Sequence, residues 1–81
     1  MKPGDTVKRS EHAIRPKRDY WLSCGREPMR SVAQGALDTA KADRGVIIEG
    51  PTVNAYGAEV IVVRLTSGAV ESAMSYLWEP A

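Results

Sequence analysis

The clearest pattern in this chain is the alternation of apolar and polar residues in its second half. The runs at 45–49 and 58–65 are rich in valine and isoleucine, which favour strands. In the longer run we expect Ile61, Val63 and Leu65 to face the core. The pattern therefore predicts two long strands with an apolar inner face.

Turn residues divide this half into short segments. Gly50 and Pro51 interrupt the first run, and Ser67 and Gly68 follow the second. We expect a further strand over 69–73, a single 3₁₀ turn at 75–77 and a last short strand at 78–79. Short strands joined by tight turns predict an antiparallel sheet.

The segment 29–43 has a helical period and is rich in helix formers. Its apolar residues fall on one narrow face of small side chains: Val32, Ala33, Ala36, Leu37 and Ala40. Ser31 as an N-cap and Pro28 as a first helical residue are alternative starts, and Gly45 can end the helix. We predict a helix near 29–43 that lies close against another element.

The first 28 residues carry weaker signals. Residues 6–9 form a short first strand with Val7 as the inward candidate. The polar segment 10–18 contains Pro16 and is interpreted as a loop. Residues 19–24 are compatible with either a helical turn or a short extended piece, ended by Gly25.

The order of these segments resembles an SH3-like small β-barrel. Pro-Gly-Asp-Thr-Val at 3–7 is similar to its first strand, Val-Val-Arg-Leu-Thr-Ser-Gly at 62–68 to its third-strand hairpin, and Tyr-Leu-Trp-Glu at 76–79 to the 3₁₀ turn into strand five. The resemblance covers about residues 3–9 and 45–80. It implies a mainly β fold with one helix, a five-stranded antiparallel barrel with a helical insertion at 10–44 between strands one and two. We expect one domain over 1–81, which in size and style resembles small proteins of bacteria and their prophages.

The composition removes several functional classes. One cysteine, Cys24, and one histidine, His12, offer neither a disulfide nor a structural zinc site, and no glycine-rich phosphate loop is present. No apolar run approaches the roughly 20 residues of a membrane helix. We expect a cytoplasmic protein that is not an enzyme and needs no metal or cofactor, with Cys24 partly buried and His12 at the surface.

Charge is unevenly distributed although the net charge is only +1. Residues 1–30 hold eight basic and four acidic side chains, whereas residues 31–81 hold three and six. Cations beside aromatic rings can bind DNA or RNA through phosphates and unpaired bases. The candidate nucleic-acid residues are Arg15, Lys17, Arg18, Tyr20, Trp21, Arg26 and Arg30.

In a second interpretation the binding surface is formed by apolar residues rather than by the basic ones. Val60 and Val62 make the outer face of the strand at 60–65 apolar as well. Together with the small-residue helix face, this strand could bind a protein partner or another copy of the chain. On this interpretation the protein is a non-enzymatic binding module that acts in protein–protein interaction or self-assembly. Trp78 is expected to fill the end of the barrel rather than to line a peptide groove.

Overall fold

The fold combines one antiparallel sheet with a pair of helices. The computed structural model describes residues 1–81. Its elements follow in the order β1 (Thr6–Arg9), α1 (Glu11–Ser23), α2 (Met29–Ala42), β2 (Arg44–Val53), β3 (Glu59–Leu65), β4 (Val70–Met74), the 3₁₀ helix η1 (Ser75–Leu77) and β5 (Trp78–Pro80). The expected boundaries of β3, β4, η1 and β5 are confirmed to within one residue, and α2 occupies the predicted helical segment. The predicted break at Gly50 and Pro51 is wrong, because β2 continues through them to Val53 with shifts in its pairing register.

The five strands form a single open sheet. Their order is β4-β3-β2-β1-β5, and every neighbouring pair is antiparallel. The antiparallel sheet is confirmed, but the prediction of a closed barrel is wrong, because β4 and β5 lie at opposite edges and do not pair. Two contacts lie outside the strand pairing: the Ser10 N–H donates to the Leu77 carbonyl of η1, and Arg9 on β1 donates to Glu71 on β4.

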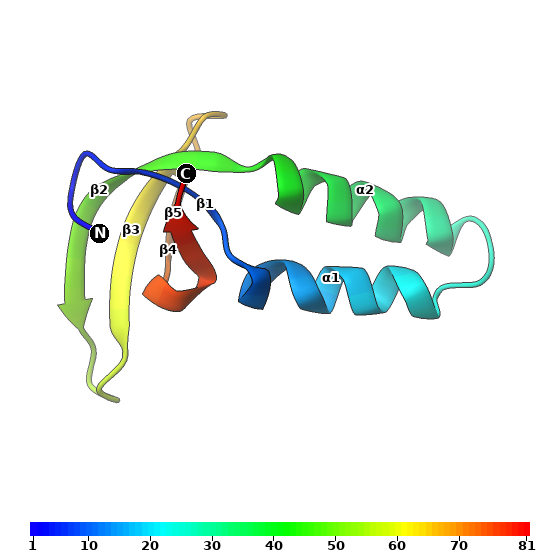
Figure 1. The fold of residues 1–81 in the computed structure, drawn as a ribbon, viewed down its shortest axis with the longest axis horizontal. Coiled ribbons are helices and arrows are strands. Elements are labelled where there is room, and N and C mark those ends of the chain that lie inside the picture. Colours follow the sequence, from blue (N-terminus) through cyan, green and yellow to red (C-terminus); the bar gives the residue numbers. More distant parts are fainter.

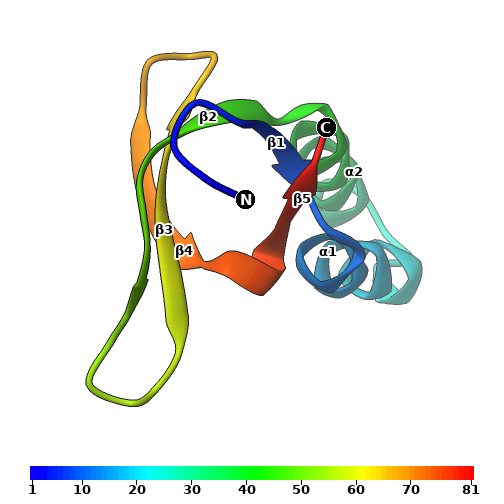
Figure 2. The same ribbon diagram turned by 60° about the vertical axis from the view of Figure 1, so that its left-hand side comes forward.

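Strand β2 bends so that the sheet curves around its core (Figure 2). Its pairing with β3 shifts register twice, between Ile47 and Glu49 and between Glu49 and Thr52. Gly50 lies at the bend with φ of 96°, and a Cβ there would come within 2.8 Å of the Val60 carbonyl oxygen. The bend therefore needs glycine for two reasons, its backbone angle and the close approach of β3.

The core of the sheet is small and lies inside this curve. Its buried residues come from four different strands: Val7, Ile47, Ile61, Val63 and Trp78. Ile61 and Val63 face inward as their alternation predicts, and Leu65 packs beside them half-buried. Trp78 is 2% exposed, so the expectation that it fills the interior is confirmed.

Helix α1 corrects the sequence interpretation of 10–18 as a loop. The helix runs through Pro16 and continues over the ambiguous segment to Ser23. Proline removes one helical hydrogen bond, which is why the segment was expected not to be helical. Packing of α1 on α2 offsets this loss, and this contact is not visible in local propensity.

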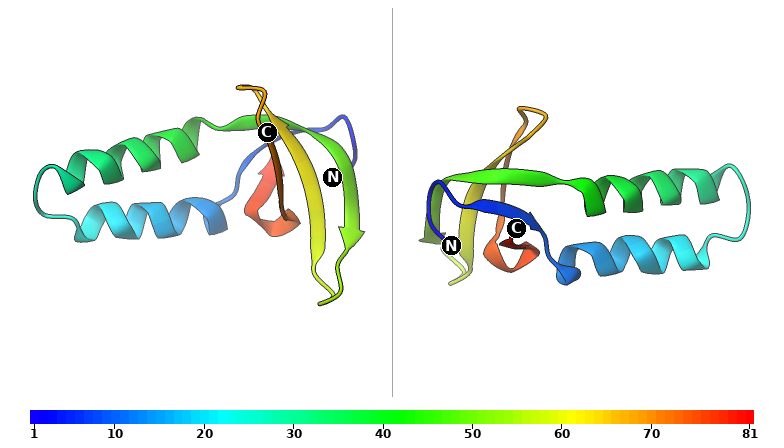
Figure 3. Two further views of the ribbon diagram at one scale, coloured as in Figure 1. Left: turned by 180° about the vertical axis from the view of Figure 1, so that it is seen from behind. Right: turned by 45° about the horizontal axis from the view of Figure 1, so that its top comes forward.

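Helices α1 and α2 form a hairpin that projects from the sheet (Figures 1 and 3). Ala33, Leu37 and Ala40 are the buried residues of α2, whereas no residue of α1 is buried. The predicted helix face is therefore only partly correct, since Val32 is 60% exposed. Neither helix is long and apolar enough to cross a lipid bilayer.

Candidate interaction surfaces

All seven predicted nucleic-acid residues lie on the helical hairpin. Arg15, Lys17, Arg18, Tyr20 and Trp21 are on α1, Arg26 is in the connecting turn, and Arg30 is in the first turn of α2. The structure thus gathers them on one supersecondary unit. The same hairpin also carries acidic side chains among the basic ones, including Asp19, Glu27 and Asp38. The hairpin is therefore a mixed rather than a strongly basic surface.

Three of these candidates are occupied by contacts within the chain. Arg18 donates to Glu11 at 2.6 Å, and this hydrogen bond lowers the pKa of the glutamate. The Arg30 guanidinium lies 4.9 Å from the centroid of the half-buried Trp21 ring. Because one face of the indole carries this cation, that face does not offer a stacking platform to a base.

His12 and Cys24 do not form a reactive pair. They lie near opposite ends of α1, twelve residues apart, which corresponds to about 18 Å along a helix. The His12 ring packs edge-on against Tyr76 with centroids 5.6 Å apart, whereas the Cys24 thiol raises the pKa of the Tyr20 phenol. Cys24 is half-buried and His12 exposed, as expected.

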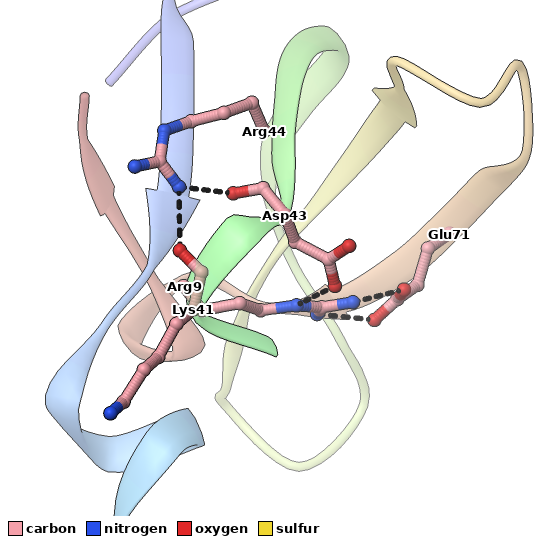
Figure 4. A network of polar contacts seen from close by, with 5 residues as sticks. All are labelled: Arg9, Lys41, Asp43, Arg44 and Glu71. Carbon is pink, nitrogen blue, oxygen red and sulfur yellow. Dashed lines mark hydrogen bonds and ion pairs between the residues drawn. The ribbon is translucent and has the colours of Figure 1, made fainter. Parts of the chain in front are cut away.

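The strongest polar cluster of the molecule centres on Arg9 (Figure 4). Its Nη1 and Nη2 donate to the two carboxylate oxygens of Glu71 at 2.8 Å each, and its Nε donates to Asp43 at 3.1 Å. The guanidinium carbon also lies 4.0 Å from the centroid of Trp78. These contacts join β1, β4 and the end of α2, so Arg9 fastens the helical hairpin to the sheet.

Arg44 completes the connection at the start of β2. One of its guanidinium nitrogens donates to the carbonyl oxygens of Lys41 and Asp43, at 3.0 and 2.7 Å (Figure 4). These are carbonyl groups at the C-terminal end of α2, which lack partners inside the helix. Arg44 therefore caps α2 at the point where the chain enters the sheet.

Contacts within the Arg9 cluster shift the pKa values of Arg9 and Glu71. Hydrogen bonding to Glu71 is the main reason that the pKa of Arg9 is raised, although burial acts in the opposite direction. The same bond lowers the pKa of Glu71 below its ordinary value of 4.5. Both groups therefore remain charged at neutral pH. Neither of them gains or loses a proton near that pH, as a general acid or base would have to do.

A cleft of about 510 Å³ opens above this cluster, between the hairpin and β4. Its walls are mostly small or polar side chains: Arg9, Ala13, Lys17, Gly35, Ala36, Thr39, Ala40, Asp43 and Glu71. Two basic and two acidic groups balance one another in this lining. The cleft therefore has no net attraction for an anionic or a cationic ligand.

Large apolar side chains also lie on several parts of the surface. Only eight hydrophobic residues are buried, whereas twelve large ones are exposed. The exposed ones fall on the hairpin (Tyr20, Leu22, Met29, Val32), the outer face of β2 (Val46, Ile48), the β2–β3 arm (Val53, Tyr56) and the β4–η1 segment (Val70, Met74, Tyr76), with Met1 at the terminus. Exposed large apolar side chains are candidates for contact with a partner where they lie close together.

The surfaces named from sequence for protein binding are partly covered within the molecule. Val60 and Val62 on the outer face of β3 are half-buried, and Ala33, Leu37 and Ala40 are buried on α2. Sequence reasoning missed the Arg9 cluster, although a signal exists. Arg9 follows Val7 by two residues, so the period of a strand places both on the inner face, where a charge needs a partner.

Comparison with known proteins adds no relative to this description. Neither protein-family models, nor curated proteins, nor solved structures give a match to this chain. The functional argument therefore rests on the geometry of the chain itself.

Proposed function

We propose that this protein is a non-enzymatic binding module that acts by protein association, with self-assembly as its basic activity. The observation that carries the proposal is the excess of exposed over buried large apolar side chains. Burying apolar surface is the main driving force for association, and a chain that leaves so much of it in water gains most by acquiring a partner.

The dimensions of the molecule support the same conclusion. A compact protein of 8.8 kDa exposes about 4,800 Å², whereas this chain exposes 5290 Å². Its radius of gyration is 14.1 Å, compared with about 12 Å for a compact chain of this length. The projecting helical hairpin accounts for this extension, since it places two helices beyond the sheet.

Sedimentation velocity between low micromolar and near-millimolar concentration tests the proposal. We expect the weight-average mass to rise with concentration, and the rise to persist at high salt because apolar contacts are not screened. A constant monomeric mass over the whole range would refute self-assembly.

A second candidate function is nucleic-acid binding by the hairpin. The observation that favours it is that Arg15, Lys17 and Arg26 have no ion-pair partner within the chain, whereas Arg18 does. Replacing Arg15 and Lys17 with glutamate should then weaken binding to short mixed DNA and RNA and reduce its salt dependence. Arg64→Glu, on the outer face of β3, is the matched control. Unchanged affinity of the double variant would reject this function.

We also infer that the sheet is an SH3-like barrel that remains open. The strand order, the bend in β2 and the 3₁₀ helix η1 before β5 support this assignment. The helical hairpin between β1 and β2 is then the insertion that distinguishes this chain from the plain pattern.

A further inference from the structure

Strand β4 is an edge strand whose free side is unprotected. It pairs only with β3, and in Figure 2 it lies on the opposite side of the view from the two helices. Natural proteins shield such edges with lysine, proline or covering loops. The sequence of β4, Val-Glu-Ser-Ala-Met, has neither lysine nor proline.

The pairing register identifies which backbone groups point outward. The Leu65 N–H donates to the Ala69 carbonyl at 2.8 Å, which fixes the hydrogen-bonded positions of the β3–β4 ladder. Bonded and non-bonded pairs alternate along an antiparallel ladder, so Glu71 and Ala73 bond to β3. The N–H and C=O groups of Val70, Ser72 and Met74 therefore face the free edge.

The one charge on β4 is neutralised from within. The Glu71 carboxylate is held by both Nη atoms of Arg9 and turned away from the outer face. The outward-facing side chains of β4 are those of Val70, Ser72 and Met74, which are all exposed. The edge thus presents free hydrogen-bonding groups next to neutral side chains, which suits an added strand.

We propose that the occupant of this edge is β4 of a second copy, paired antiparallel about a two-fold axis at Ser72. This inference rests on the proposed function, and it adds which surface the two copies use and the two-fold symmetry that relates them. With Ser72 opposite its counterpart, Val70 of each copy faces Met74 of the other. All three outward-facing residues then form hydrogen-bonded pairs, which gives six backbone hydrogen bonds.

Self-complementarity favours a second copy over a foreign segment. In this register two apolar Val70–Met74 pairs meet on one face, and no like charges stand directly opposite, because Glu71 faces Ala73 of the other copy. The same patch serves both molecules, as a two-fold interface requires. Pairing also covers an edge that would otherwise recruit strands without limit.

Apolar surface beside the strand extends the contact. A hollow of about 470 Å³ lies at the η1 end of β4, lined by residues that include Val60, Met74, Tyr76 and Leu77. The antiparallel register brings Val70 and the adjoining turn of the second copy to this end. Tyr76, 56% exposed in the monomer, would become covered there.

Two edge variants test the inference on the full chain. Ser72→Pro removes the central outward N–H without removing a bond to β3, and Met74→Lys places a charge in each apolar pair. Ser72→Pro removes two hydrogen bonds per dimer, one from each copy, and should raise the dimer dissociation constant by roughly tenfold or more. Met74→Lys should raise it as well, because each dimer then carries two lysines in contacts that were apolar. Val53→Lys, with the same added charge on the β2–β3 arm, is the matched control and should dimerise as the unmodified chain does.

Hydrogen exchange provides a second readout that does not depend on substitutions. The Ser72 amide should exchange more slowly as protein concentration rises, and that of Glu71 should be protected at all concentrations. If the chain self-associates but neither edge variant weakens the association and Ser72 exchange is unaffected, the β4 interface is wrong while self-assembly stands. If Ser72→Pro does not fold, Met74→Lys and the exchange data decide. A strict monomer refutes both proposals.

Discussion

Replacing Arg9 with methionine should remove a large part of the stability of this protein. The substitution keeps an apolar stem of similar length but deletes three charge-assisted hydrogen bonds and the contact with Trp78. It also leaves Asp43 and Glu71 without their cation. A partly buried carboxylate that loses its partner is costly, because its hydration is only partly restored.

The magnitude follows from the contacts. The cation–π contact with Trp78 contributes about 1 kcal/mol. The bidentate pair with Glu71 contributes about 1 kcal/mol, because 37% of the glutamate side chain is exposed and solvent screens the interaction. The bond to Asp43 adds about 1 kcal/mol. The total of about 3 kcal/mol is a large share of the roughly 4–12 kcal/mol expected for 81 residues.

Urea unfolding followed by tryptophan fluorescence at one fixed protein concentration measures the loss. Arg18→Met is the matched control, because it breaks an ion pair at the surface and should leave the midpoint nearly unchanged. The concentration is held fixed because self-association would add stability of its own. Equal effects of the two substitutions would refute the view that Arg9 fastens the hairpin to the sheet.

The pH dependence gives an independent check. The pKa of Glu71 is lower in the folded state than its ordinary value of 4.5, chiefly through its hydrogen bond to Arg9. Its contribution to stability is therefore present above about pH 4.5 and lost as the pH falls through the folded pKa. The stability difference between the original chain and Arg9→Met should shrink below pH 4.5. A difference that stays constant down to pH 3 would show that the carboxylate contributes little.

Two glycine substitutions should act in opposite directions. Gly45→Ala should destabilise the fold by about 1–3 kcal/mol, because the added Cβ would lie 2.4 Å from Val63 Cγ1 and 2.9 Å from the Arg64 carbonyl oxygen. Gly35→Ala should raise stability by about 0.5–1 kcal/mol, since Gly35 lies inside α2 with open space around its Cα. Thermal unfolding measures both, and a loss of stability for Gly35→Ala or none for Gly45→Ala would contradict the described packing.

The sequence by itself determined the elements that depend on local pattern. The alternation around Ile61 and Val63 identified β3 and its inner face, and the turn at Ser67 and Gly68 marked the β3–β4 hairpin. The helical period at 29–43 identified α2. These features are predictable because side-chain period and turn chemistry act between residues a few positions apart.

Tertiary structure decided what depends on residues far apart in the chain. Helix α1 forms despite Pro16 because α2 packs against it, and Arg9 finds Glu71 sixty-two residues away. Whether the sheet closes is likewise set by the relative positions of β4 and β5, which no local pattern encodes. The candidate interface at Ser72 is visible only in the structure, because a free edge is defined by the neighbour that a strand lacks.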